Sequence, residues 1–101
     1  MAKDAREITR EDFAAHRGEV FHITPQAGED TEAELVEVTG HARNPDAPRE
    51  PFSLVFRTTG EHGCEQQICT VRHEALGELA LFLVPLGPDG EGRMRYEAVF
   101  T

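Results

Sequence analysis

Thiol and imidazole groups gather in one short region of the sequence, at His62, Cys64, Cys69 and His73. Thiolate and imidazole are preferred ligands of zinc, and a tetrahedral site needs four ligands. The four side chains are therefore a candidate metal-binding or small-ligand-binding site. The spacing fits loosely, because structural zinc sites usually pair their cysteines as Cys-x-x-Cys. Cys69 also falls in a strand-like segment on the same face as Val71, which favours an ordinary buried cysteine.

The same residues allow two other hypotheses. Cys64 could act as a nucleophile with His62 or His73 as its base, which would make a thiol hydrolase. No residue stands out as the third group that such a site needs to orient the base, so this hypothesis is the weaker one. A disulfide between Cys64 and Cys69 would fit across a tight loop, but an intracellular protein is expected to keep its thiols reduced.

Other common chemistries lack their residues. Lys3 is the only lysine and Ser53 the only serine. A Schiff-base lysine or phosphate-binding P-loop is therefore excluded within the fold, and so is a Gly-x-Ser-x-Gly nucleophile elbow. The acidic stretch 29–34 and the 89–91 loop do not follow the pattern of a calcium loop. We expect no cofactor, and a non-enzymatic role over an enzymatic one.

The charge balance restricts the partners. The chain has 10 Lys and Arg residues against 19 Asp and Glu, a formal net charge of -9. A nucleic acid or an anionic membrane surface would meet mostly like charge. The longest apolar run, 79–84, is far shorter than the roughly 20 residues of a membrane-spanning helix. Residues 1–7 lack the apolar segment of a secretory signal, so a cytoplasmic location is the default expectation.

One short helix is expected near the start of the chain. Thr9 is a suitable N-cap, and Ile8 can pack against Phe13 across the first turn. Gly18 would end a helix of about nine residues, which is too short to be stable alone. Phe13 must therefore dock on another element.

The rest of the chain predicts an all-β domain. Alternating apolar residues and Gly- or Pro-rich loops predict about six strands, at 19–24, 32–39, 52–57, 67–73, 78–85 and 94–101, with 87–92 as a hairpin loop. The run 79–84 has no polar alternation, so we expect a central strand covered on both faces. His22 shares a face with Val20 and is interpreted as a core or rim residue. Short loops imply antiparallel pairing in a small barrel or sandwich, as a single domain over 1–101 with 1–7 as a flexible tail.

Three motifs carry a resemblance to a known family. They are Pro-Phe-Ser-Leu at 51–54, Leu-Phe-Leu-Val-Pro at 81–85 and Tyr-Glu-Ala-Val-Phe at 96–100, and Phe13 and the stretch 34–38 extend the likeness. The chain resembles a family of small uncharacterised bacterial all-β proteins. The resemblance assigns no catalytic residues. It implies association with proteins that bear phage-tail-collar-like domains, and thus a part in assembling a fibre.

These observations favour an interaction or assembly module with a protein partner. A small open barrel leaves strand groups that another chain can complete, so a homo-oligomer through an exposed sheet edge is one expected form. The alternative is metal or small-ligand binding at the cysteine and histidine cluster.

Overall fold

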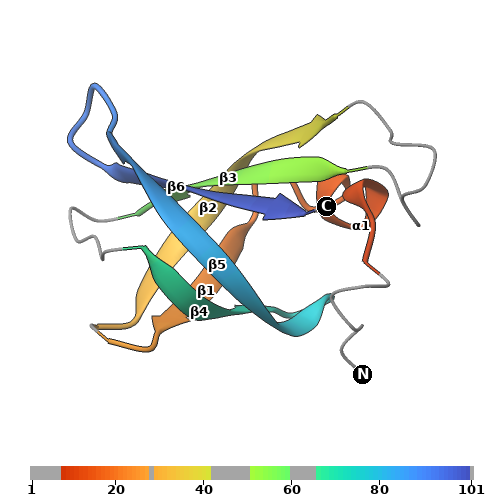
Figure 1. Cartoon of the computed structure of the whole chain (residues 1–101), viewed down its shortest axis with the longest axis horizontal. Coiled ribbons are helices and arrows are strands. Elements are labelled where there is room, and N and C mark those ends of the chain that lie inside the picture. Colours follow the sequence, from red (N-terminus) through yellow and green to blue (C-terminus); the bar gives the residue numbers. More distant parts are fainter. Residues whose placement is uncertain (1–7, 28, 42–50, 60–65, 101) are drawn as a thin grey trace.

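The computed structural model describes residues 8–27, 29–41, 51–59 and 66–100. These residues form one short helix and six strands (Figure 1). In chain order they are α1 (Arg10–Ala14), β1 (Val20–Pro25), β2 (Thr31–Gly40), β3 (Phe52–Thr58), β4 (Gln67–His73), β5 (Gly77–Pro88) and β6 (Met94–Phe100). No helix among these residues is long and apolar enough to cross a membrane. The predicted tail 1–7 lies outside the described residues.

The six strands close into a barrel in the order β1-β2-β3-β6-β5-β4. Every neighbouring pair is antiparallel. Closure comes from β1, which pairs with β2 on one side and with β4 on the other. The predicted all-β antiparallel fold with one short N-terminal helix is confirmed, and the β1–β4 pairing decides for a barrel over a sandwich.

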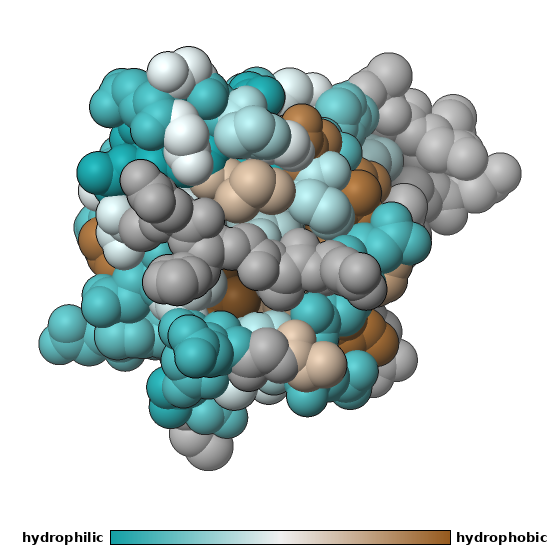
Figure 2. All heavy atoms as spheres, turned by 90° about the vertical axis from the view of Figure 1, so that its left-hand side faces the viewer, coloured by the Kyte–Doolittle hydropathy of each residue, from teal (hydrophilic) through white to brown (hydrophobic). Residues whose placement is uncertain are grey.

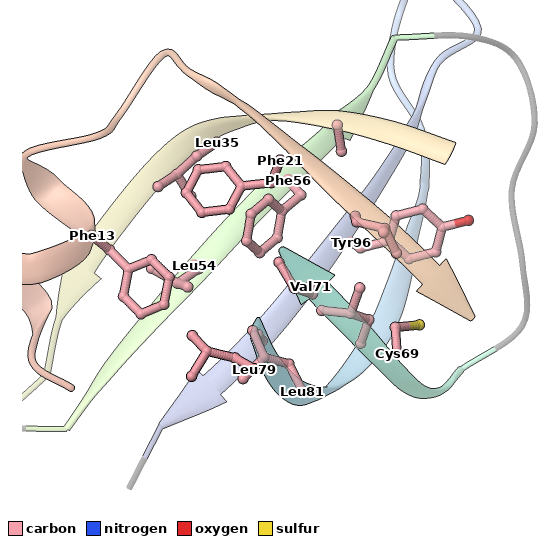
Figure 3. Packing of buried hydrophobic residues seen from close by; sticks show 14 of the residues in the cluster. Phe13, Phe21, Leu35, Leu54, Phe56, Cys69, Val71, Leu79, Leu81 and Tyr96 are labelled. Carbon is pink, nitrogen blue, oxygen red and sulfur yellow. The ribbon is translucent and has the colours of Figure 1, made fainter. Parts of the chain in front are cut away.

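Side chains from alternate positions of every strand fill the interior (Figure 3). Because successive residues of a strand point to opposite sides, each strand sends every second side chain inward. The predicted inward set Phe52, Leu54 and Phe56 is fully buried, and Tyr96, Ala98 and Phe100 face it from β6. The register pairs Phe52 with Phe100, and their rings stack with centroids 4.4 Å apart.

Helix α1 closes one end of the barrel with Phe13. Its ring lies 5.6 to 6.3 Å, centroid to centroid, from the rings of Phe21, Phe52 and Phe100. Both Phe13 and Ile8 are fully buried. The Asp12 carboxylate accepts hydrogen bonds from the backbone N–H and the hydroxyl of Thr9, at 2.9 and 3.2 Å. The first turn is therefore tied down where the sequence predicts the helix to begin.

The helix is shorter than predicted, five residues rather than about nine. After Ala14 the chain continues in tight turns, with the His16 N–H bonded to the Phe13 carbonyl and the Arg17 N–H to the Ala14 carbonyl. Gly18 then takes a φ of 91°, which glycine adopts without strain. Once Phe13 is seated, these turns lead the chain directly into β1.

Strand β5 departs from the prediction in two ways. Leu79, Leu81 and Leu83 point inward, whereas Phe82 is 52% exposed. The expectation that both faces of 79–84 are covered is wrong, because a barrel has a single layer and nothing described packs on its outside. The strand also runs on to Pro88, past the predicted start of the hairpin loop, because a bulge between Pro85 and Gly87 lets it keep pairing with β6.

The loop between β5 and β6 is organised by Asp89. Its carboxylate accepts hydrogen bonds from the backbone N–H groups of Glu91 and Arg93, at 2.8 and 3.0 Å, and from the guanidinium of Arg57 on β3. The hydrogen bond from Arg57 is the main cause that lowers the pKa of Asp89 from 3.8 to about 2. The acidic loop is therefore hairpin structure, as the sequence predicts, and its charge is balanced by arginine.

We expect Phe13→Ala to lower the free energy of unfolding by about 3 to 5 kcal/mol, because the ring fills the end of the core and leaves a cavity when removed. Urea unfolding followed by circular dichroism measures the change. Phe82→Ala is the matched control, and its cost is expected to be much smaller because that ring is half exposed. Equal losses in both variants would contradict the role given to α1.

Asp89→Asn should remove a pH-dependent part of the stability. The pKa of Asp89 is lower in the folded chain than its ordinary value, so its ionised form stabilises the fold above about pH 4, and this contribution disappears as the pH falls towards about 2. The difference in free energy of unfolding between wild type and variant should thus shrink over that interval. Arg57→Gln, which removes the main partner of this carboxylate, should show the same convergence. A difference that stays constant with pH would contradict the ion pair.

Candidate functional site

The structure does not bring the predicted cysteine and histidine cluster together within the described residues. Cys69 is fully buried on the inner face of β4, beside Val71. His73 ends the same strand four residues later, which places its Cα about 13 Å from that of Cys69 in an extended chain. One zinc ion holds its ligand atoms at about 2.0 to 2.3 Å, so it cannot bind both side chains. His62 and Cys64 lie outside the described residues, so their part in a site stays a prediction.

His73 instead meets two side chains from the start of the chain. Its Nε2 lies 2.7 Å from Oε1 of Glu19, and Nδ1 of His16 lies 3.1 Å from the same oxygen. The rings of His16 and His73 are 4.5 Å apart, centroid to centroid. Two imidazoles and one carboxylate thus converge on a single point. We call these three residues the His-Glu-His cluster.

Backbone hydrogen bonds hold the first two members in place. The Glu19 N–H donates to the His16 carbonyl at 3.1 Å, and the Glu19 carbonyl accepts from the Leu35 N–H of β2 at 3.0 Å. The Gly18 N–H donates to the Leu35 carbonyl at 2.7 Å. The positive φ of Gly18 turns the backbone towards β2, where this bond forms. The turn that follows α1 is therefore fixed to the sheet on both sides of Glu19.

Packing of its ring holds the His73 side chain in place. The ring packs on Phe21 with centroids 4.4 Å apart, and the side chain is only 8% exposed. Its Nδ1 accepts a hydrogen bond from the Ala75 N–H at 3.0 Å, in the tight turn that Gly77 completes with a φ of 78°. Because Nδ1 accepts, the proton of the neutral ring lies on Nε2 and is donated to Glu19.

The cluster stabilises the charge of its carboxylate. The hydrogen bond from His73 is the largest cause that lowers the pKa of Glu19, and His16 adds to it. Glu19 remains half exposed, so its second oxygen can reach solvent. A surface depression of about 410 Å³ lies beside the cluster, lined by His22, Arg72, His73, Glu74, Gly77 and Glu78.

His22 itself is exposed on the outer face of β1. Of the two interpretations of this residue, core or rim, the core one is wrong, because Phe21 and Ile23 are the positions of β1 that face inward.

A second pair, Ser53 and His41, has the composition of a nucleophile with its base. His41 Nε2 lies 3.0 Å from the Ser53 hydroxyl oxygen. Ser53 sits within β3, where the strand pairs on one side with Thr39 of β2 and on the other with Val99 of β6. Backbone N–H groups engaged in two ladders cannot form an oxyanion hole, so the β3 backbone around Ser53 offers none of the donors that acyl transfer needs. We interpret this contact as structural.

Three exposed apolar side chains lie on the outer faces of β4, β5 and β6. Ile68 and Phe82 are direct partners in the β4–β5 register and are 46% and 52% exposed. Val99 on β6 is 60% exposed. By contrast, the barrel end opposite α1 shows mostly hydrophilic side chains, with hydrophobic ones in small separate areas (Figure 2). We call Ile68, Phe82 and Val99 the outer apolar stripe.

A family model described as a domain of unknown function matches residues 8–100, nearly the whole chain. The chain belongs to the DUF6916 family. No curated protein and no solved structure is significantly similar to it. Membership in DUF6916 agrees with the resemblance to a small uncharacterised domain, and it assigns no residue a role.

The sequence pointed to only one member of the His-Glu-His cluster. His16 and Glu19 are three residues apart, a spacing common on any helix or turn, while Glu19 and His73 are 54 apart. Only the β1–β4 pairing makes these segments neighbours. No local pattern in the sequence announces that pairing.

The burial of Cys69 predicts its reactivity. In a Cys64→Ser variant, in which Cys69 is the one remaining cysteine, a thiol reagent should label the native DUF6916 protein slowly and the unfolded protein at once. Mass spectrometry of samples quenched over time follows the reaction. Rapid labelling of the folded protein would contradict the placement of Cys69 in the core.

Proposed function

We propose that this DUF6916 chain is a non-enzymatic interaction module that binds a protein partner through the outer apolar stripe. The observation that carries the proposal is the half-exposed ring of Phe82 with Ile68 directly opposite it on β4. Full burial of an exposed phenylalanine side chain contributes about 1.5 to 3 kcal/mol, so the half-exposed ring of Phe82 forgoes roughly half of that. Aromatic residues, phenylalanine among them, are enriched in protein interfaces relative to the rest of the surface.

The course of β5 and β6 keeps this surface open. The register between them runs from Pro88 and Met94 to Val84 and Glu97, and beyond that point the two strands diverge (Figure 1). Phe82 and Val99 lie two residues beyond the last pair, one on each strand. The stripe therefore lies where the two strands separate, and a partner could contact side chains of both.

The residues around the stripe suit a partner with basic groups. Glu97 lies two residues before Val99 on the same face of β6, and the whole chain carries a net charge of -9. Apolar side chains with one acidic neighbour, on a chain of net negative charge, are complemented by an apolar segment that carries lysine or arginine. The same charge opposes association of two copies of this chain through this face.

The homo-oligomer through an exposed sheet edge stays a prediction. Each described strand pairs with a neighbour on either side over part of its length, because β1 and β4 close the barrel. Recognition by side chains on the outer face replaces it in the proposal.

Two further points support a binding role. The interior is filled with buried hydrophobic side chains, so the described barrel has the build of a packed scaffold (Figure 3). The resemblance to small bacterial proteins associated with phage-tail-collar-like domains suggests one class of partner, and assembly of such a fibre is the finer form of the proposal.

A photo-crosslinking amino acid placed at position 82 or 99 of the full chain, in the native cells, should trap the same partner from both positions. Position 20 is the control, since Val20 is 44% exposed on β1. With the identified and purified partner, Phe82→Thr combined with Val99→Thr should weaken binding by at least about tenfold in isothermal titration calorimetry. Threonine keeps the strand propensity, so the fold should persist.

Val20→Thr should leave the binding constant unchanged. Three results would overturn the proposal: equal crosslinking from position 20, crosslinks only between copies of this chain, or unchanged partner affinity in the double variant.

A further inference from the structure

We propose that the His-Glu-His cluster binds a divalent transition metal ion of the zinc class. The ligand atoms are Nδ1 of His16, one carboxylate oxygen of Glu19 and Nε2 of His73, which lie within 4.8 Å of one another. This site is separate from the outer apolar stripe and does not depend on the proposed function.

The geometry is close to that of a metal centre. Both ring nitrogens point at Oε1 of Glu19, from 3.1 and 2.7 Å. Ligands about 2.0 to 2.1 Å from a tetrahedral zinc lie about 3.3 Å from each other, so shifts on the order of 1 Å would admit the ion. Without a metal, ligand groups arranged in this way hydrogen-bond to one another, as these do.

The donor set selects the metal. Imidazole nitrogen suits zinc, copper and nickel, whereas calcium and magnesium prefer oxygen ligands. Two histidines and one glutamate are a known ligand combination for zinc, and three protein ligands leave a position for water. Glu19 is half exposed, so an ion can reach the cluster from solvent.

The ligands are held in place before any ion arrives. Backbone hydrogen bonds fix the turn of His16 and Glu19 against Leu35, and Phe21 packs on the His73 ring. Groups already in position lose little conformational freedom on binding. This distinguishes the cluster from an arbitrary group of exposed acidic and imidazole side chains.

The hydrogen bond from the Ala75 N–H to His73 opposes metal binding, and its loss would be a specific sign that the metal has bound. Nε2 of His73 can bind a metal only if the ring proton moves to Nδ1, and Nδ1 then no longer accepts from the Ala75 N–H. Loss of one such hydrogen bond weakens binding by a factor of about 2 to 13, which lowers the affinity without abolishing it. Metal binding should therefore free the Ala75 amide.

Zinc titrated into the full chain should bind with one ion per chain in isothermal titration calorimetry, and should raise the melting temperature. Glu19→Gln and His16→Gln should each weaken binding by at least about tenfold, because each removes or replaces a ligand. Both positions are accessible to solvent, so these variants should still fold. Substitution of His73 is avoided because its ring packs on Phe21.

Two controls separate the cluster from other histidines and cysteines. His22→Gln changes an exposed histidine beside the depression and should leave the affinity unchanged. His62→Asn combined with Cys64→Ser removes the remaining members of the cluster predicted from the sequence, and should also leave it unchanged. In NMR spectra, zinc should shift the Ala75 amide signal and increase its rate of hydrogen exchange.

The proposal is overturned if zinc does not bind, if binding is lost in the His62 and Cys64 variant but kept in both cluster variants, or if the Ala75 amide is unaffected by saturating zinc. None of these results would bear on the outer apolar stripe.

Discussion

The pairing of β1 with β4 is the interaction on which the rest of the structure depends. It turns a row of antiparallel strands into a closed sheet with one interior. A barrel of this size has room inside only for its own side chains, so alternate residues must point inward and the others must face outward. Whatever the protein contacts must therefore be reached from the outer face or from an end of the barrel.

The end that α1 closes shows how packing and chemistry are linked. Phe13 has to pack against the stacked rings of Phe52 and Phe100, and the chain must then return to the sheet within a few residues. The tight turns that make this return carry His16 and Glu19 to the end of β4. The His-Glu-His cluster is thus a consequence of how the helix plugs the barrel, and its rigidity comes from the same backbone hydrogen bonds.

The sequence predicted the fold well where apolar and polar residues alternate or where a turn has distinctive residues. Phe52, Leu54 and Phe56 were placed in the core on that basis, and Gly18 at the end of the helical region. The prediction from sequence failed at 79–84, because a run of apolar residues does not show which face of the strand is covered. Only the closed single layer shows that Leu81 lies inside and Phe82 outside. Periodicity describes one strand, whereas exposure depends on what packs against it.

The candidate site was harder to predict because nearness in sequence misleads within a strand. Cys69 and His73 looked like partners at a separation of four residues, yet an extended chain carries them apart. The contact of His73 with Glu19 depends on register instead: His22 pairs with Arg72, which places His73 beside Phe21 and near the residues that precede β1. A slip of one residue would turn His73 to the outside and remove it from Glu19. The β1–β4 register that closes the core is therefore also the register that brings the His-Glu-His cluster together. Selection that preserves the core would also preserve the cluster, and the reverse.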